Sequence, residues 1–392
     1  MGTPLSSLKI LDFTTLLPGP TATMMLGDMG ADIIKVEAPQ RPDMMRMMPP
    51  FKEGTSAAHG YLNRSKRSLA LNLKSEEGRK VVKRLVSHYD IVMEQFRPGV
   101  MERLGLGYGD LRKVNPRVIY CSVSGYGQTG PFRERAGHDL NYLSVAGVMA
   151  YNGRGESGPA PMGLQVADIA GGAYHSVMGI LAAVISRAET GEGQHVDISM
   201  TDAAFSMHSL TAPAFFCDGS EPGLENTVFN GGTAYDCYET KDGRHFSMAG
   251  IEPHFFARTC DALGHPELKE HALSLDPEVQ RNLKEKIAAA MKEKTFGEWQ
   301  VIFADLDACI EPVLTLKEAC DHPQIKAREM IVEVPSKEGE ESQLACPIKF
   351  SHTPLTYRFS GAALGEHSEE ILTSAGYGED EIRALRESGV IL

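Results

Sequence analysis

The segment 8–37 constrains the fold more than any other part of the chain. Residues 8–13 are an apolar run typical of a buried strand, and a Pro-Gly-Pro turn at 18–20 separates it from a helical stretch over 21–29. Residues 30–37 then form a second strand-like run that ends in an acidic residue. A strand, a turn, a helix and a strand in this order predict the βαβ unit of a doubly wound, parallel sheet.

The alternation of strands and helices continues along the first half of the chain. A Ser-x-Glu-Glu start followed by apolar residues at helical spacing predicts a helix over 75–88. Further strands are predicted at 68–73, 91–94, 117–123 and 195–198. No Gly-x-Gly-x-x-Gly follows the first strand, and the glycine-rich segment 124–130 lacks the Gly-Lys-Ser/Thr end of a P-loop. The sequence therefore predicts an α/β fold with a Rossmann-like parallel sheet, and nicotinamide binding is not expected.

The chain is too long for one ordinary core, because its 392 residues predict two domains. We expect a large Rossmann-like domain over 1–200 and 336–392, a linker over 201–231 and a small α+β domain over 232–335. Glycine, proline and asparagine become frequent in the linker. The small domain opens on a hairpin built on an Asp-Gly turn at 242–243.

Composition argues against several classes of partner. The net charge of -13 disfavours nucleic acid, because a phosphate backbone requires a clustered basic surface. No uninterrupted apolar run is long enough to cross a membrane, and the N-terminus lacks a targeting signal, so we expect a cytoplasmic protein with no membrane partner. Seven cysteines without a Cys-x-x-Cys pair indicate neither a disulfide framework nor a zinc site, and no metal is predicted.

One histidine and one aspartate are the candidates for chemistry. His138 lies in Gly-His-Asp-Leu-Asn-Tyr, and Asp168 lies in Ala-Asp-Ile-Ala-Gly-Gly. The two glycines of the second motif, Gly171 and Gly172, are costly in a helix and are expected where another backbone or a ligand approaches closely. Each alone has a structural interpretation: His138 as a histidine satisfied within the fold, and Asp168 as the N-cap of a helix that runs to about residue 188. If the fold brings them to opposite faces of one bound molecule, they form two bases that can exchange a proton across a single carbon. The chain is then an epimerising enzyme.

Several motifs spread along the chain carry a resemblance to a known family. These motifs are Pro-Gly-Pro at 18–20, Gly-Ala-Asp-Ile-Ile-Lys-Val-Glu at 30–37, Asn-Arg-Ser-Lys-Arg-Ser at 63–68, Phe-Arg-Pro-Gly at 96–99, Ser-Gly-Tyr-Gly at 124–127 and Thr-Gly-Glu-Gly-Gln at 190–194. Together they resemble the family III CoA-transferases, the CaiB/BaiF superfamily, over almost the whole chain. Within that superfamily, the segments 137–142, 167–168 and 250–256 resemble the α-methylacyl-CoA racemase branch.

This resemblance implies catalytic roles and an assembly. His138 is implied to be a base, Asp168 an acid, and Glu252 a group that hydrogen-bonds the histidine. The family also implies a homodimer of interlocked chains, with the site between one subunit's large domain and the other's small domain, so that Glu252 reaches His138 across the dimer. The implied partner is an acyl-CoA thioester, and no cofactor is expected because CoA is part of the substrate.

Basic residues on two loops suit the phosphates of CoA. Arg64, Lys66 and Arg67 share one loop and Arg97 lies on another, and we expect them to bind the phosphates. The alternative for the first loop is a solvated basic turn. The resemblance adds four CoA contacts, namely Arg41, Phe96, Asp139 and Tyr142.

Three functions stay open, and racemisation of 2-methylacyl-CoA thioesters is favoured. His138 would take the α-proton from the 2S substrate while Asp168 delivers one to the opposite face, and the roles reverse for the 2R substrate. A helix N-terminus would drive Asp168 toward its charged form, so the pair is expected to share one proton. The alternative is a CoA-transferase with Asp168 as nucleophile. Because both kinds of enzyme use an aspartate at this position, only His138 discriminates between a racemase and a CoA-transferase. A non-catalytic acyl-CoA-binding protein is the third possibility.

Overall fold

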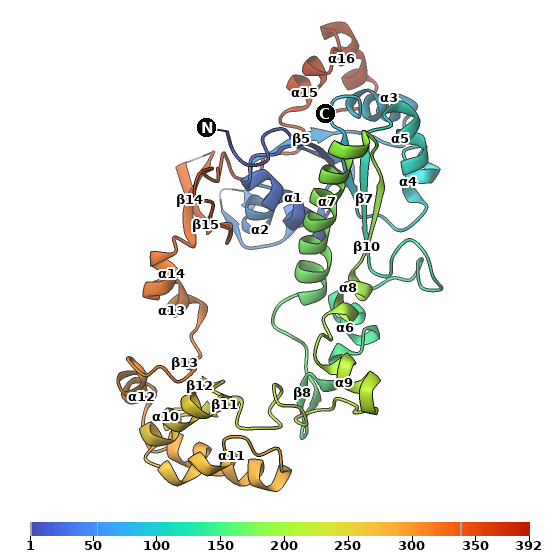
Figure 1. Cartoon of the computed structure of the whole chain (residues 1–392). Coiled ribbons are helices and arrows are strands. Elements are labelled where there is room, and N and C mark those ends of the chain that lie inside the picture. The colour runs from blue at the N-terminus through green and yellow to red at the C-terminus, as the bar shows by residue number, and fades with distance from the viewer. Residues whose placement is uncertain (1, 53, 338) are drawn as a thin grey trace. The chain divides into compact units, whose positions relative to one another are not determined.

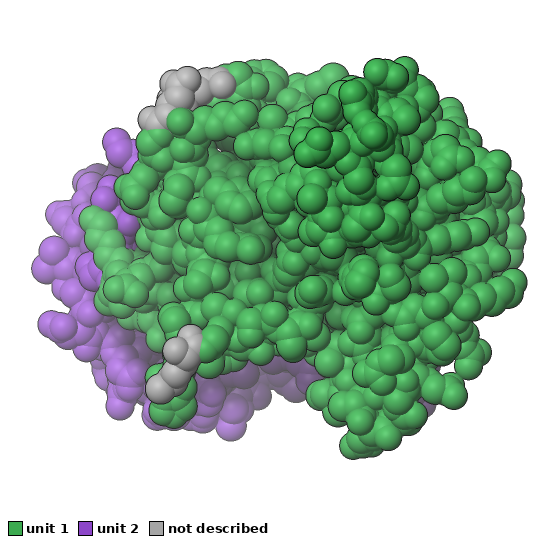
Figure 2. Space-filling view, turned by 90° about the horizontal axis from the view of Figure 1, so that it is seen from above, with its two compact units in different colours: residues 1–146, 164–207, 324–392 green, residues 147–163, 208–323 purple. Residues whose placement is uncertain are grey.

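The computed structural model describes residues 2–52, 54–337 and 339–392, which divide into two compact units (Figure 2). The larger unit comprises Met1–Ala146, Leu164–Met207 and Gln324–Leu392, and the smaller unit comprises Gly147–Gly163 and His208–Pro323. Both ends of the chain therefore contribute to the larger unit.

The division of the chain differs from the predicted boundaries at three places. The predicted linker 201–231 is not a separate segment, because residues 201–207 belong to the larger unit and residues 208–231 to the smaller unit. Residues 324–335 belong to the larger unit because the strands β14 (Ile331–Ser336) and β15 (Gly339–Leu344) pair as one antiparallel hairpin, which the predicted boundary would cut. Residues 147–163 belong to the smaller unit. The guanidinium of Arg154 binds the carboxylates of Glu225 at 3.0 Å and Asp236 at 2.6 Å within that unit.

A six-stranded parallel sheet organises the larger unit (Figure 1), as the sequence predicts. Its strands, in spatial order, are β5 (Lys66–Ala70), β2 (Asp32–Glu37), β1 (Lys9–Asp12), β6 (Ile91–Glu94), β7 (Ile119–Ser124) and β10 (His195–Ser199). Taken in chain order this is the 3-2-1-4-5-6 arrangement of a doubly wound fold. The strand order reverses between β1 and β6, and ligands of such sheets bind at the carboxyl ends of the strands at this switch point.

Helices cover both faces of the sheet (Figure 1). The helices of the larger unit are α1 (Pro18–Asp28), α2 (Ala57–Leu62), α3 (Glu76–Leu85), α4 (Val100–Arg103), α5 (Tyr108–Val114), α6 (Asp139–Val145), α7 (His175–Thr190), α8 (Met200–Ser206), α15 (Ser368–Ser374) and α16 (Glu379–Glu387). One face packs Leu11, Val92 and Tyr120 against a buried cluster to which α3, α4, α5, α15 and α16 contribute. Helices α1 and α7 contact the sheet on the other face. The unit also holds the short elements η1 (Met44–Met47), β3 (Phe51–Lys52) and β4 (Thr55–Ser56), and α14 (Pro323–Ala327) begins at its boundary.

The C-terminal segment covers the outer edge of β5. The backbone N–H of Ser68 donates to His367 Nδ1 at 3.2 Å, and the N–H of Ala70 donates to Ser368 Oγ at 3.3 Å. Ser65 donates its N–H to the carbonyl of Phe359 at 2.8 Å. The unpaired backbone groups of an edge strand can pair with another chain. Here the C-terminal segment of the same chain hydrogen-bonds several of these groups of β5.

The helix that carries Asp168 departs from the prediction. Asp168 is not an N-cap: it is the second residue of a π-helical segment, η3 (Ala167–Tyr174), which continues into α7. The two glycines that follow it, Gly171 and Gly172, are expected from the sequence to allow a close approach, and this is confirmed. A Cβ on Gly172 would lie 2.7 Å from Pro18 Cβ, and one on Gly171 would lie 3.2 Å from the carbonyl oxygen of Met200.

The continuous helix Ala167–Thr190 is also long and apolar enough to cross a membrane by length and composition alone, with a mean hydropathy of 1.5. A search for an uninterrupted apolar run misses it because polar residues such as His175 and Arg187 interrupt the pattern. One face of the helix, including Val177 and Ile180, is buried. A single helix of this kind is weak evidence for a membrane segment, because a core helix passes the same test.

The smaller unit has its own sheet and core. Strands β11 (Asp236–Glu239), β12 (His245–Met248) and β13 (Ile310–Pro312) form an antiparallel sheet. The predicted hairpin is present, and Gly243 takes the positive φ of 75° that its turn requires. The other elements are η2 (Val148–Tyr151), β8 (Gly153–Arg154), β9 (Gly158–Pro159), α9 (Thr211–Asp218), α10 (Pro253–Leu263), η4 (Pro266–His271), α11 (Pro277–Met291), α12 (Phe296–Phe303) and α13 (Leu316–Asp321). Trp299 is fully buried in the core.

Candidate active site

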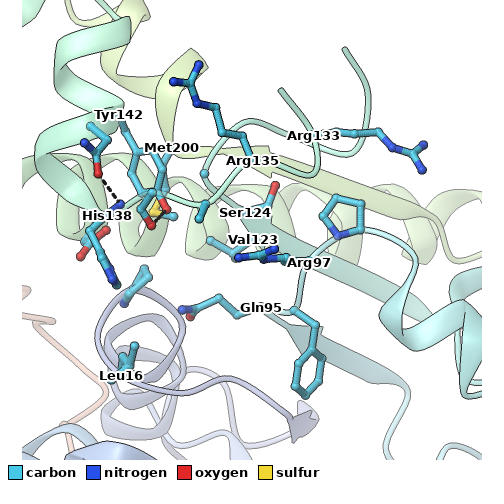
Figure 3. A pocket seen from close by; sticks show the side chains of 18 residues that line it. Leu16, Gln95, Arg97, Val123, Ser124, Arg133, Arg135, His138, Tyr142 and Met200 are labelled. Carbon is cyan, nitrogen blue, oxygen red and sulfur yellow. Dashed lines mark hydrogen bonds between the residues drawn. The ribbon is translucent and has the colours of Figure 1, made fainter. Parts of the chain in front are cut away.

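A cavity of about 460 Å³ opens at the switch point of the sheet (Figure 3). Its walls come from the loops after β1, β6 and β7, from α6 and η3, and from the start of α8. The residues that line it are Leu16, Pro18, Gln95–Pro98, Val123–Gly125, Arg133, Arg135–His138, Asn141, Tyr142, Asp168 and Met200. His138 and Asp168 therefore share one cavity, as the sequence analysis required for a two-base reaction.

The start of α1 differs from the phosphate-binding turn that dinucleotide-binding Rossmann folds have after the first strand. Helix N-termini bind phosphate through free backbone amides. Pro18 and Pro20 carry no N–H, and the N–H of Gly19 donates to Gln95 Oε1 at 3.0 Å. Thr21 donates its N–H to the carbonyl of Leu17 at 3.0 Å. The first turn of α1 thus presents no free amide to an anion in the cavity.

His138 precedes α6 at the edge of the cavity. Its backbone N–H donates to Asn141 Oδ1 at 3.1 Å, the bond drawn in Figure 3. The hydroxyl of Tyr142 donates to the carbonyl of Gly137, and a Cβ on Gly125 would lie 2.2 Å from the Tyr142 ring. The buried tyrosine therefore fixes the turn that carries the histidine, while the imidazole itself is exposed.

Asp168 faces the same cavity from η3. It is partly buried, and its backbone N–H donates to Asp139 Oδ1 at 3.0 Å. Burial raises the pKa of Asp168 to about 6, and the negative charge of Asp139 raises it further, while the charge of His138 acts in the opposite direction. A carboxyl with this pKa exchanges a proton near neutral pH, which a general acid or base requires.

Glu252, the third predicted catalytic residue, belongs to the smaller unit. It is exposed and occupies the N-cap position of α10. The predicted pairing of Glu252 with His138 across a dimer stays a prediction.

Two of the predicted phosphate ligands lie in the interior instead. Arg64 is fully buried and donates from Nε and Nη2 to the two carboxylate oxygens of Asp28, at 2.8 and 2.6 Å. Lys66 is buried as well, with Nζ 3.2 Å from Asp12 Oδ2 and 3.0 Å from the carbonyl of Pro20. Neither side chain presents its charge to solvent or to the cavity. The alternative of a solvated basic turn is wrong for the same reason.

Of the other predicted CoA contacts, some line the cavity and others lie outside it. Arg67 is partly exposed and binds the carboxylates of Asp32 and Glu370. Arg41 is exposed beyond the end of β2. Arg97, Phe96 and Tyr142 line the cavity, and Phe96 also packs against the core cluster. Asp139 holds the backbone of Asp168, as described above.

The sequence analysis missed several polar residues of the cavity. Arg133 and Arg135 line it together with Arg97, and Arg135 has no carboxylate partner among the described residues. The Ser124 hydroxyl also lines the cavity and is buried without a hydrogen-bond partner in the described chain. The signal for the arginines was present, because Arg-Glu-Arg at 133–135 directly precedes the histidine motif.

Comparisons with known proteins agree with this architecture. The model of CoA-transferase family III matches residues 5–368. Alpha-methylacyl-CoA racemase of Homo sapiens is 36% identical over 99% of this chain and 97% of its own. Succinyl-CoA:glutarate CoA-transferase of Mus musculus is 32% identical over 99% of this chain and 90% of its own. The crystal structure of a CAIB/BAIF family protein from Brucella suis has a TM-score of 0.83 at 31% identity and covers 96% of this chain and 100% of that chain.

The fold, the cavity and the relatives define an enzyme class that includes both racemases and CoA-transferases. The chain belongs to CoA-transferase family III, the CaiB/BaiF family. The resemblance drawn from the sequence motifs is thereby confirmed. Relatives with the two activities have similar identity to this chain, so the reaction has to be argued from the site.

Proposed function

We propose that this enzyme racemises 2-methylacyl-CoA thioesters by moving a proton across the α-carbon. The observation that carries the proposal is that His138 and Asp168 line one cavity, with the pKa of Asp168 raised to about 6. A carboxyl that titrates near neutral pH and an imidazole in the same cavity are the acid and base that an exchange of one proton for another requires.

The reaction proceeds in two proton transfers. In the 2S substrate the C–H bond of the α-carbon breaks, its proton goes to the imidazole of His138, and the electron pair forms the enolate of the thioester. The carboxyl proton of Asp168 then adds to the opposite face of the α-carbon, which leaves Asp168 ionised. For the 2R substrate Asp168 begins ionised and His138 begins protonated. The two starting forms of the enzyme therefore contain the same number of protons.

The surroundings of Asp168 support the role of an acid. Sequence reasoning placed it at a helix N-terminus, which would favour the charged form. In the structure Asp168 lies in the first turn of η3, and burial and the nearby Asp139 nevertheless raise its pKa and favour the neutral form. Both effects retain the proton that a racemase must deliver.

The alternative function is transfer of CoA between a thioester and a carboxylic acid. In that reaction the ionised Asp168 attacks the thioester carbonyl, and an acyl anhydride and then an aspartyl-CoA thioester follow. The similarity to succinyl-CoA:glutarate CoA-transferase favours this alternative. His138 argues for racemisation, because nucleophilic attack by Asp168 needs no second base on the α-carbon.

We further propose that two chains form the site, with Glu252 of one subunit orienting His138 of the other. An apolar stripe on the outside of η3 and α7 supports an association of two copies. Tyr174, Met178 and Ile185 lie on one side of this continuous helix and are 42%, 56% and 66% exposed. Exposed apolar stripes of this kind mark interaction surfaces. Arg97 and Arg135 are the residues we assign to CoA phosphates in place of Arg64 and Lys66.

A solvent-exchange experiment tests the proposal. One epimer of a 2-methylacyl-CoA is incubated with the protein in deuterium oxide, with and without an acceptor acid such as glutarate. Racemisation predicts α-deuterium and loss of stereochemical purity in the absence of an acceptor. If the α-proton is retained and CoA moves to the acceptor, the enzyme is a transferase. Bound CoA with neither reaction would identify a binding protein.

A further inference from the structure

Glu94 is a buried carboxyl directly beneath the cavity. It is the last residue of β6, is only 5% exposed, and precedes the segment Gln95–Pro98 that lines the cavity. We refer to Gln95–Pro98 as the switch-point loop, because it follows the strand at which the order of the sheet reverses. No role in the reaction proposed above uses Glu94.

The carboxylate holds the switch-point loop from below. Glu94 Oε2 accepts the backbone N–H of Phe96 at 2.8 Å. The loop has a second anchor, because the Gln95 side chain accepts the N–H of Gly19 at the start of α1. The direction of the backbone between these two anchors determines where Arg97 enters the cavity (Figure 3).

A hydrogen-bonded chain connects Glu94 to the surface. Ser122 on β7 lies opposite Glu94 in the sheet register, where its hydroxyl lowers the pKa of that carboxyl, and Ser122 Oγ lies 2.9 Å from Nε2 of His195 on β10. A serine hydroxyl carries a single proton. If Ser122 donates that proton to an ionised Glu94, then His195 must donate its Nε2 proton to Ser122. Protonation of Glu94 allows the hydroxyl to turn and to donate toward His195 instead.

Within the described part of the chain, no lysine, arginine or histidine forms an ion pair with this carboxyl. The charged and titratable groups that face it are the carboxylates of Glu102 and Asp197, the thiol of Cys121, the phenol of Tyr120 and, through Ser122, the imidazole of His195. Burial is the main cause that raises the pKa of Glu94 to about 7, and Glu102 and Asp197 add to it. The bonds from Ser122 and Phe96 act in the opposite direction.

We infer that Glu94 is a positioning residue whose ionised carboxylate holds the switch-point loop in its CoA-binding geometry, and whose protonation through the Ser122–His195 chain weakens that hold. A hydrogen bond to an ionised acceptor is about twice as strong as one to a neutral acceptor. The loop is therefore held firmly above neutral pH and less firmly below it. This inference rests on the proposed function, because it takes the cavity to be a CoA site.

The test measures binding of free CoA by titration calorimetry at pH 6 and pH 8. We expect the native protein to bind CoA about fivefold more weakly at pH 6 than at pH 8 through loss of the charge-assisted bond. CoA phosphate groups titrate in the same range. The variant Glu94→Gln retains an acceptor for the Phe96 N–H but cannot ionise, so the pH dependence should shrink to the part that the CoA phosphates and Asp168 contribute.

Two further variants make the result interpretable. Glu94→Ala removes the acceptor and should weaken CoA binding at both pH values and raise KM more than it lowers kcat. Glu387→Gln alters an exposed acid on α16 that is not among the groups that raise the pKa of Glu94, and it should keep the native pH dependence. If Glu94→Ala does not fold, Glu94→Gln still decides the question.

The outcomes separate this inference from the proposed function. If Glu94→Gln binds CoA with the pH dependence of the native protein, Glu94 is not a positioning residue, while the proposed function is unaffected. If the native protein binds no CoA at either pH, the proposed function itself is wrong. A Glu94→Gln variant with the smaller pH dependence, beside an unchanged Glu387→Gln control, supports the inference.

Discussion

The two halves of the six-stranded sheet use the same residue types for different purposes. In and around β1, β2 and β5, charged side chains are buried and paired with one another. At the ends of β6 and β7, polar side chains border a cavity, and several have no partner among the described residues. The difference shows that the pairing of a charged residue, rather than its presence in a motif, decides whether it is available to a ligand.

The charged side chains of the paired half form an extended network of ion pairs and hydrogen bonds. Asp12 accepts hydrogen bonds from Thr14, Thr23 and Lys66, and Lys35 lies 3.0 Å from the carboxylate of Asp43. The remaining ion pairs of this half are Arg46 with Glu37 and Arg64 with Asp28. Arg64 and Lys66, which were predicted to bind CoA phosphates, are both used in these pairs.

The largest expected effect concerns the unpaired half. Asp168→Asn cannot give or take the catalytic proton, so racemisation should slow by about 10²- to 10⁴-fold. The thermal midpoint should hardly change, because the Asp168 side chain has no hydrogen bond to lose among the described residues. Deuterium exchange at the α-carbon and a thermal scan measure the two quantities. An active Asp168→Asn variant would contradict the assignment of the acid.

The next effect tests the paired half. Arg64→Ala leaves the buried Asp28 without its partner and should lower the free energy of unfolding by about 3 to 5 kcal/mol. The matched control is Arg67→Ala, whose ion pairs are partly exposed and contribute about 1 kcal/mol or less. Urea denaturation compares the two. Equal effects would show that burial does not distinguish the two arginines of this loop.

A smaller effect follows from the raised pKa of Glu94. An ordinary glutamate in the unfolded chain has a pKa near 4.5, and the folded value is about 7. Between these values the folded state holds the extra proton, so the stabilisation that it brings at low pH is lost as pH rises toward 7. The free energy of unfolding of the native protein should therefore fall by about 3 kcal/mol between pH 5 and pH 8. Glu94→Gln cannot ionise, so its free energy of unfolding should not show this fall. Urea midpoints at the two pH values measure it, and an unchanged slope with pH would contradict the assignment.

The smallest effect concerns Asp139. Asp139→Asn removes a negative charge that raises the pKa of Asp168, so that pKa should fall and the limb of the pH–rate profile governed by Asp168 should move to lower pH. Because the enzyme forms that accept the two epimers differ only in where one proton resides, kcat/KM should have the same pH profile in both directions. Different profiles for the two epimers would exclude the shared-proton mechanism.

Much of this architecture could be predicted from local sequence patterns. Strand and helix periodicity predicted the order of the parallel sheet's elements, and the glycines after Asp168 indicated a close approach that the structure contains. His138 and Asp168 could be singled out as a pair because residue chemistry suggested complementary roles. Their shared cavity depends on the fold, which the periodicity had already indicated.

The errors came from contacts between residues far apart in the chain. Arg64 pairs with a carboxylate 36 positions earlier and Lys66 with one 54 positions earlier, and no local pattern reports such pairs. The π-helical turn at Asp168 depends on the packing of η3 against α1 and α8, so propensity alone suggested an ordinary N-cap. Residues 324–335 were assigned to the smaller unit because the partner strand of β14 was not recognised.

The cover of β5 by the C-terminal segment has a consequence for biosynthesis. A ribosome releases the first strands of the sheet long before it makes residues 358–392. Until then β5 has an open edge, and the apolar face that Ile371, Leu385 and Ile391 later cover is exposed to water. The nascent chain therefore carries an uncovered sheet through most of its synthesis. Premature termination near the end of the message should yield aggregates rather than a shortened enzyme.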